Sequence, residues 1–144
     1  MSITVAKALA ASPELLDGLN GLLPQLSSTA PLLTMPDVEK IVDSDAATLF
    51  VASDDGVTVG TLTLVIFSIP TGLRAYIEDV VVDEGTRGIG VGEALIIAAV
   101  KEARGRGVRS IDLTSRPSRE AANALYQKLG FERRDTNVWR FSLD

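Results

Sequence analysis

A strand–turn–helix unit near the middle of the chain constrains its fold more than any other feature. The segment IEDVVVD, Ile77 to Asp83, is rich in β-branched residues, and EALIIAAV, Glu93 to Val100, has the apolar character of a helix. The turn between them, TRGIGVG, Thr86 to Gly92, places glycine at alternate positions after Arg87. Because glycine allows positive φ and close approach of a ligand to the backbone, this turn predicts exposed main chain at a helix start.

Exposed main chain at this position predicts an anion site. The first N–H groups of a helix lack acceptors within the helix, and the helix dipole is positive there. Phosphate binds such a helix start, and Arg87 adds a cation beside it. The alternative is a tight strand-to-helix turn that binds no ligand. Three alternating glycines behind an arginine favour the anion site over this alternative. A dinucleotide motif G-x-G-x-x-G is absent, because Glu93 or Leu95 stands at its last glycine position, and no Walker loop is present.

The rest of the pattern predicts an α/β sandwich with a mixed sheet, in one domain over residues 1–144. Ser12 and Pro13 predict a helix start, and Pro24 predicts the end of that helix. The expected strands cover residues 3–8, 47–53, 57–67, 74–82, 109–115 and 138–143. The expected helices cover residues 13–23, 36–42, 91–104 and 118–129, the last one capped by Ser118. Asp54-Asp55-Gly56 predicts a tight turn, and Ser68 to Leu73 a loop.

Composition narrows the chemistry. The chain has no cysteine and no histidine, which excludes disulfides, thiolate or imidazole metal ligands and serine–histidine catalysis, so we expect no metal. A general acid or base must then be Asp, Glu, Tyr, Lys or a relayed water. The net charge of −5 argues against nucleic acid as a partner. No secretory signal or membrane-spanning run is visible, so we expect a soluble cytoplasmic protein with no membrane partner.

The glycine turn resembles a known family. Arg87, Gly90 and Gly92 fill the pattern Arg-x-x-Gly-x-Gly, which resembles the pyrophosphate-binding motif of the GNAT superfamily of acyl-CoA-dependent N-acyltransferases. IEDVVVDEGTRGIGVGEALI is similar to that family's fourth strand, loop and third helix. AANALYQKLGF, Ala121 to Phe131, is similar to its closing helix. The resemblance covers about the second half of the chain, while the first half agrees in element order. It implies an α/β (α+β) fold with a mixed sheet of about six or seven strands and about four helices, splayed between the fourth and fifth strands.

The same resemblance implies acetyl-CoA as cosubstrate and assigns residues to it. Backbone N–H groups of the glycine turn would hold the pyrophosphate: Arg87, Gly88, Ile89, Gly90, Val91 and Gly92. The backbone of Val80, Val81 and Val82 would hydrogen-bond the pantetheine arm. Asn123 and Tyr126 lie three positions apart, so they share a helix face that would meet the thioester. Many relatives carry asparagine where this chain has Arg119.

The resemblance also implies catalytic roles. Tyr126 is the family's usual general acid for the departing thiolate, and the alternative is a packed helix tyrosine. Glu78 is the expected base, with Asp79 or a water relay as alternatives, or a structural carboxylate paired with an arginine. IEDVVVD is similar to the stretch that serves aminosugar-phosphate acetyltransferases at their substrate site. Simple strand alternation predicts that Glu78 and Val81 point to opposite faces.

The sequence therefore predicts an acetyltransferase that moves an acetyl group from acetyl-CoA to a primary amine by direct attack. The alternative is a non-catalytic acyl-CoA-binding or nucleotide-binding module. The acceptor, a small amine or a protein amine, has no recognisable motif. The final strand places Trp139 and Phe141 on one face, and pairing of this strand with another chain predicts a homodimer.

Overall fold

The computed structural model describes residues 2–144 and divides the chain into two compact units, one ending at Leu113 and the other running from Thr114 to Asp144. The strands are β1 (Ile3–Lys7), β2 (Ala47–Asp54), β3 (Val57–Ile69), β4 (Gly72–Val82) and β5 (Ser110–Asp112). The helices are α1 (Pro13–Leu26), α2 (Met35–Val42), α3 (Val91–Gly105) and α4 (Glu120–Lys128), with a 3₁₀ turn, η1, at Glu84–Thr86. No helix within residues 2–144 is long and apolar enough to cross a membrane.

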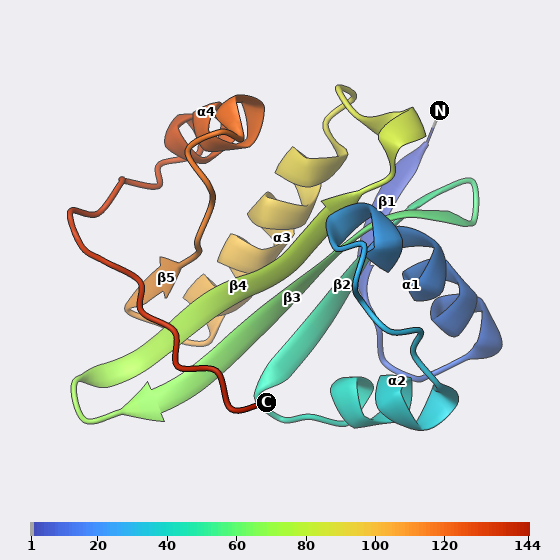
Figure 1. Cartoon of the computed structure of the whole chain (residues 1–144), viewed down its shortest axis with the longest axis horizontal. Coiled ribbons are helices and arrows are strands. Elements are labelled where there is room, and N and C mark those ends of the chain that lie inside the picture. The colour runs from blue at the N-terminus through green and yellow to red at the C-terminus, as the bar shows by residue number, and fades with distance from the viewer. Residues whose placement is uncertain (1) are drawn as a thin grey trace. The chain divides into compact units, whose positions relative to one another are not determined.

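The first unit is built on a mixed sheet with the order β1-β2-β3-β4-β5 (Figure 1). Neighbouring strands are antiparallel from β1 to β4, and β5 runs parallel to β4. The mixed sheet and the four helices agree with the prediction. The expected six or seven strands are not confirmed, because the described residues form a sheet of five.

Helices cover both faces of this sheet. On one face Leu49 packs with Leu15 and Leu19 of α1 and Val38 of α2. On the other face, a Cβ added to Gly60 would lie 3.0 Å from Val91 and 3.2 Å from Leu95 of α3. The glycine therefore lets α3 approach the central strand closely, and β3 is buried between helices on its two sides.

The first helix starts as predicted and ends later. The Ser12 hydroxyl accepts a hydrogen bond from Leu15 N at 3.1 Å, and Pro13 opens α1. The expectation that Pro24 ends this helix is wrong, because α1 continues to Leu26. Pro24 has no N–H to donate, but Ser27 N donates to Leu23 O at 3.0 Å, so helical bonding resumes after the proline.

Of the two predicted connections between neighbouring strands, one is confirmed and the other is shorter than predicted. Asp55 and Gly56 have φ of 49° and 83°, as a two-residue hairpin turn requires, and the predicted turn is confirmed. The expected loop from Ser68 to Leu73 is too long. Strand pairing extends to Ile69 opposite Gly72, whose φ of 130° suits a sharp reversal.

The second unit holds α4 and an extended C-terminal segment. Arg119 occupies the N-cap position of α4 without a side-chain bond, so Ser118 does not cap this helix as predicted. The expected strand over residues 109–115 is reduced to Ser110–Asp112. The expected strand over residues 138–143 is absent, and Trp139 and Phe141 are each 87% exposed. Alternating apolar residues make a strand only when a neighbouring strand accepts their backbone bonds.

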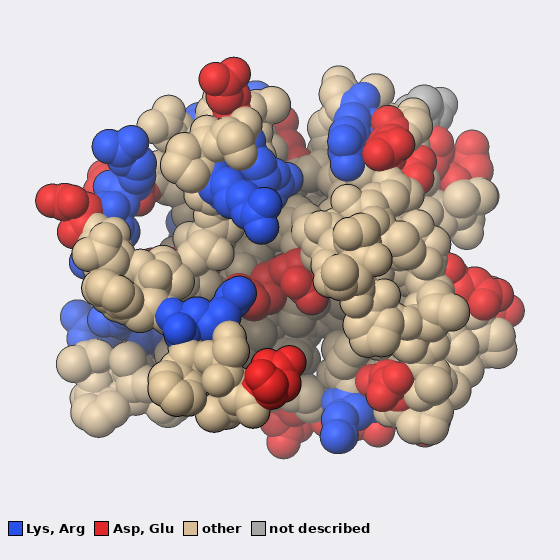
Figure 2. Space-filling model, in the orientation of Figure 1, with Lys and Arg blue, Asp and Glu red and all other residues tan. Residues whose placement is uncertain are grey.

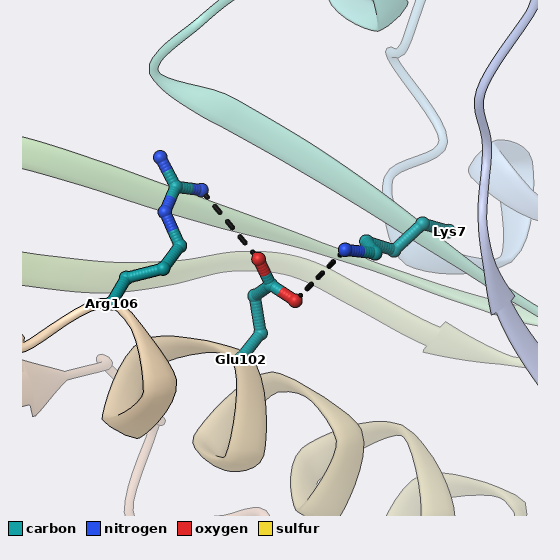
Figure 3. Close-up of polar contacts among 3 residues, drawn as sticks. All are labelled: Lys7, Glu102 and Arg106. Carbon is teal, nitrogen blue, oxygen red and sulfur yellow. Dashed lines mark hydrogen bonds and ion pairs between the residues drawn. The ribbon is translucent and has the colours of Figure 1, made fainter.

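One ion-pair cluster links the first strand to α3 (Figure 3). Lys7 Nζ lies 3.0 Å from Glu102 Oε1, and Arg106 Nη1 lies 3.8 Å from Glu102 Oε2. The Lys7 side chain is 45% exposed, so solvent screens the pair and its contribution to folding is about 0–1 kcal/mol.

Candidate functional site

A β-bulge in β4 shapes the centre of the first unit. Thr63 of β3 pairs with Glu78, but Thr61 pairs with Val81, so one residue of β3 faces two of β4. The extra residue sits beside Asp79, whose φ of 50° lies in the left-handed region that aspartate tolerates. The prediction that Glu78 and Val81 point to opposite faces is therefore wrong: their partners Thr63 and Thr61 share a face of β3.

The bulge lies where β4 loses its second neighbour. β5 pairs with β4 only from Arg74 to Tyr76, and within residues 2–144 no strand pairs with Ile77–Val82 on that side. The sheet is therefore open beside the second half of β4, where a splay was predicted. Main-chain groups along this edge are available to a ligand that can pair like a strand.

The backbone directions along this edge can be assigned. Asp83 N donates to Val59 O at 2.8 Å, so Asp83 turns its main chain toward β3. Alternation then turns Val82 toward the open side, Val81 toward β3 and Val80 toward the open side. Arg87 Nε donates to Val82 O at 3.3 Å, which agrees with an outward Val82 carbonyl.

The glycine turn that follows is open main chain. Gly88 and Gly90 have φ of 84° and 92°, and an added Cβ at either would meet nothing within 4 Å. None of the N–H groups from Gly88 to Gly92 donates to a backbone carbonyl within the part of the chain that the structure describes. Gly90 is the N-cap of α3, so these N–H groups stand at the positive end of a helix that starts at Val91. The exposed Arg87 adds charge, and the turn can hold a phosphate.

A glutamine of α1 fixes the beginning of this turn. Gln25 Nε2 donates to Asp83 Oδ1 at 2.9 Å, and Gln25 Oε1 accepts from Glu84 N at 3.0 Å. Asp83 Oδ2 also accepts from Gly85 N at 3.1 Å. Gln25 was not predicted as a site residue, because Pro24 was expected to end the helix before it.

Glu78 is an exposed carboxylate at the bulge. It forms no ion pair or hydrogen bond through its side chain with the described residues, so the alternative of a carboxylate paired with Arg74 is not what the structure shows. Its pairing partner Thr63 lies opposite Leu49 of β2, which puts Glu78 on the sheet face covered by α1 and α2. A carboxylate without a fixed partner is available to accept a proton.

The second unit carries the two predicted side chains of α4. Asn123 Nδ2 donates to Arg116 O at 3.0 Å, so this amide also closes the turn before the helix. The ring of Tyr126 meets the ring of Phe131 edge-on, with centroids 6.0 Å apart. Within residues 114–144 the Tyr126 hydroxyl makes no hydrogen bond, so its proton is not committed to a backbone partner there.

The structure thus groups the predicted residues in two sets. Glu78, Val80–Val82 and Arg87–Gly92 follow one another along the open edge and the glycine turn of the first unit. Asn123 and Tyr126 stand one helical turn apart on α4. Within residues 2–144, no cluster of acidic side chains has the arrangement of a metal site.

Comparisons of the sequence and the structure with known proteins find acetyltransferases. A model of the acetyltransferase (GNAT) family matches residues 17–131. Glucosamine 6-phosphate N-acetyltransferase 1 from Oryza sativa subsp. japonica is 31% identical over 134 residues, covering 84% of this chain and 77% of that enzyme. A mycothiol acetyltransferase from Paenarthrobacter aurescens is 46% identical over 52 residues, but the chain spans only 16% of that protein. The solved structure of a putative acetyltransferase from Agrobacterium tumefaciens has a TM-score of 0.84 and 29% identity, covering 99% of this chain and 100% of its own.

Proposed function

This chain belongs to the acetyltransferase (GNAT) family, and we propose that it transfers an acetyl group from acetyl-CoA to a primary amine. The observation that carries the proposal is the open glycine turn. Its backbone N–H groups from Gly88 to Gly92 make no backbone bonds and stand at the start of α3, directly after an open strand edge. CoA needs this combination, because its pyrophosphate is an anion and its pantetheine arm carries amides.

We propose that acetyl-CoA binds along this path. The pyrophosphate would accept hydrogen bonds from the main chain of Arg87–Gly92, with the Arg87 guanidinium nearby. The pantetheine amides would pair with the outward main-chain groups of Val80 and Val82, while Val81 stays bonded to β3. Asn123 and Tyr126 would contact the thioester end of the cosubstrate, as the family resemblance implies.

The chemistry follows from groups on this chain. The acceptor amine reaches the site as an ammonium, and Glu78 takes a proton from it directly or through a water molecule. The free amine then attacks the thioester carbonyl, forming the C–N bond and a tetrahedral intermediate. The C–S bond breaks as this intermediate collapses, and Tyr126 gives its proton to the departing sulfur, while the extra proton on the new amide nitrogen passes through water to the Tyr126 phenolate. The products are an amide and CoA. Without cysteine, an acyl-cysteine intermediate is excluded.

An amino sugar is the first acceptor to test, because the plant relative aligned over 84% of this chain acts on glucosamine 6-phosphate. The acceptor would approach the face of the sheet that α1 and α2 cover, where Glu78 lies. The surface over α1 is mostly uncharged (Figure 2), and Leu26 and Leu32 are 39% and 73% exposed in and after this helix. An acceptor with an apolar portion would fit that surface.

Two measurements test the proposal. Calorimetric titration asks whether acetyl-CoA binds, with NAD and ATP as competing nucleotides. A thiol-release assay then asks whether CoA forms with glucosamine 6-phosphate, aminoglycosides, polyamines or peptides as acceptors. Binding of acetyl-CoA with no turnover on any amine would favour the non-catalytic binding module, and binding of NAD or ATP alone would contradict the CoA site.

We also propose a cytoplasmic homodimer formed by a single-domain protein. The support for a dimer is the exposed C-terminal segment, where Trp139 and Phe141 are each 87% exposed. Contact with a second chain would remove the apolar surface of these exposed aromatic side chains from water. A monomer mass by light scattering at micromolar concentration would contradict the dimer.

A further inference from the structure

Gln25 connects α1 to the glycine turn by a pair of hydrogen bonds. Its side-chain amide donates to Asp83 Oδ1 and accepts from Glu84 N, at 2.9 Å and 3.0 Å. The two partners are neighbours at the point where β4 ends and the turn begins. Because the side-chain amide is planar, its two hydrogen bonds together fix both the position and the orientation of Asp83 and Glu84 relative to α1.

The bond to Asp83 extends into the turn. Asp83 Oδ2 accepts from Gly85 N at 3.1 Å, and the Asp83 carbonyl accepts from Thr86 N and Thr86 Oγ1, each at 3.0 Å. These bonds hold η1, which leads directly to Arg87. Beyond η1, Gly88 forms no backbone hydrogen bond with the described residues, and the next support is at the start of α3, where the Gly90 carbonyl accepts from Ala94 N at 3.0 Å. The turn is therefore held at its two ends, by η1 and by α3, and the direction of the N–H groups between them depends on how η1 is held.

We propose that Gln25 is a positioning residue for the CoA pyrophosphate: it holds the η1 end of the turn, so that the N–H groups that follow converge on the anion together with those at the start of α3. This proposal rests on the proposed function of the turn. Gln25 does not touch the anion itself, and it acts through Asp83 and η1. Because α1 belongs to the face where the acceptor would bind, Gln25 also links the two halves of the site.

A purely structural role is the competing explanation, and α1 offers a matched control for it. Asn20 is a second amide on this helix with a pair of hydrogen bonds: its Nδ2 donates to Leu33 O at 3.1 Å, and its Oδ1 accepts from Leu33 N at 2.8 Å. Asn20 therefore braces the connection to α2 and not the glycine turn. Loss of either amide removes comparable bonds from the fold, but only Gln25 reaches the turn.

The experiment compares Gln25→Leu with Asn20→Leu in CoA titrations and in steady-state kinetics. In Gln25→Leu we expect the CoA dissociation constant to rise about tenfold, the scale of losing hydrogen bonds to a charged partner. The KM for acetyl-CoA should rise with it, while the KM for acetyl-pantetheine, which lacks the pyrophosphate, stays unchanged. Asn20→Leu should bind CoA like the parent. Gln25→Glu is the second variant in case Gln25→Leu unfolds. It keeps the acceptor for Glu84 N but places a carboxylate beside Asp83, so it should also weaken CoA binding.

The outcomes separate the two proposals. If the parent protein does not bind CoA, the proposed function fails. If the parent binds CoA and a folded Gln25→Leu or Gln25→Glu binds it equally well, the positioning role fails and the proposed function stands. Equal losses for CoA and acetyl-pantetheine, or equal losses in Asn20→Leu, would also overturn the positioning role, because a general loosening of the fold would then explain them.

Discussion

Glu78 and Val81 project from the same face of β4, although simple alternation would put them on opposite faces. Their partners on β3 are Thr63 and Thr61, which are two positions apart, so one extra residue of β4 is accommodated between them. Asp79 adopts a φ of 50° to make this possible. The bulge therefore puts the Glu78 carboxylate and the side chain of Val81 on the one face of the sheet that α1 and α2 cover, and pairing with β3 resumes at Val81.

The strain at Asp79 predicts how substitutions there change stability. Asp79→Gly should keep or raise the free energy of unfolding, because glycine adopts positive φ freely. Asp79→Val should lower it by about 1–2 kcal/mol, since a β-branched residue pays the full cost of the left-handed region. Urea titrations measure both. Equal stability of the two variants would show that the positive φ is not maintained in solution.

Gly90→Glu tests the anion site. The backbone there is left-handed, with a φ of 92°, and the space is open, so the side chain fits and the conformational cost is about 1–2 kcal/mol. A carboxylate among the N–H groups should abolish the rise in melting temperature that acetyl-CoA gives the parent. Gly56→Glu is the control, because Gly56 has a φ of 83° and open space but lies in the β2–β3 turn. A folded Gly90→Glu that responds to CoA like Gly56→Glu would remove the turn from the site.

Sequence rules predicted the features that depend on neighbours along the chain. The Ser12 cap, Pro13 at the start of α1 and the Asp55–Gly56 turn are such features, and each is present. The glycine turn could also be predicted from neighbouring residues, because a strand pattern precedes it and a helix pattern follows it. These positions obey steric limits and capping rules that act over a few residues.

The features that the sequence did not reveal depend on residues far apart. The bulge at Asp79 is defined only by the register against β3, which alternation cannot show. Gln25 meets Asp83 across a sequence separation of 58 residues. Pro24 does not stop α1, because Ser27 N still donates to Leu23 O and the Gln25 side chain bonds to Asp83 and Glu84, so hydrogen bonds hold the last turn. Residues 138–143 have a strand pattern but no strand beside them within the described residues.

Glu78→Gln tests the base. Glutamine keeps the size of the side chain but cannot accept the proton of the acceptor ammonium, so we expect kcat/KM to fall about a hundredfold to ten-thousandfold. Part of the loss should return at higher pH, where more amine is already deprotonated, and CoA affinity should not change. Asp79→Asn is the comparison, because it removes the neighbouring carboxylate. If Asp79→Asn is the slow variant and Glu78→Gln is not, the base is Asp79.

The start of α2 predicts a pH effect on stability that is independent of catalysis. The Thr34 N–H and hydroxyl both donate to Asp37 Oδ2, at 2.8 Å and 2.9 Å. The backbone bond first, then the hydroxyl bond, lowers the pKa of Asp37 below its ordinary value of 3.8, and Lys40 adds to this. A lowered pKa in the folded state means that the stabilisation is complete above pH 3.8 and is lost as the pH falls through the folded-state pKa.

Asp37→Asn removes that contribution. The difference in melting temperature between parent and variant should therefore be constant near neutral pH and shrink in acid, as Asp37 of the parent becomes protonated. Thermal melts from pH 7 to pH 2 measure it. A difference that stays constant over the whole range would show that the carboxylate of Asp37 contributes through shape and not through charge.

Tyr126→Phe separates an enzyme from a binding protein. Phenylalanine keeps the ring and its edge-on contact with Phe131, and loses only the hydroxyl, which has no hydrogen bond within its own unit. If this hydroxyl protonates the departing thiolate, kcat should fall about a hundredfold to ten-thousandfold, while acetyl-CoA affinity stays within a few fold, because the group acts in the transition state. The loss should shrink with acyl donors whose thiol is more acidic, since a better leaving group needs its proton less. Thiol release with a confirmed acceptor measures these rates. Turnover of Tyr126→Phe at the rate of the parent would assign the proton to solvent or another group, and would leave the fold and the CoA site unaffected.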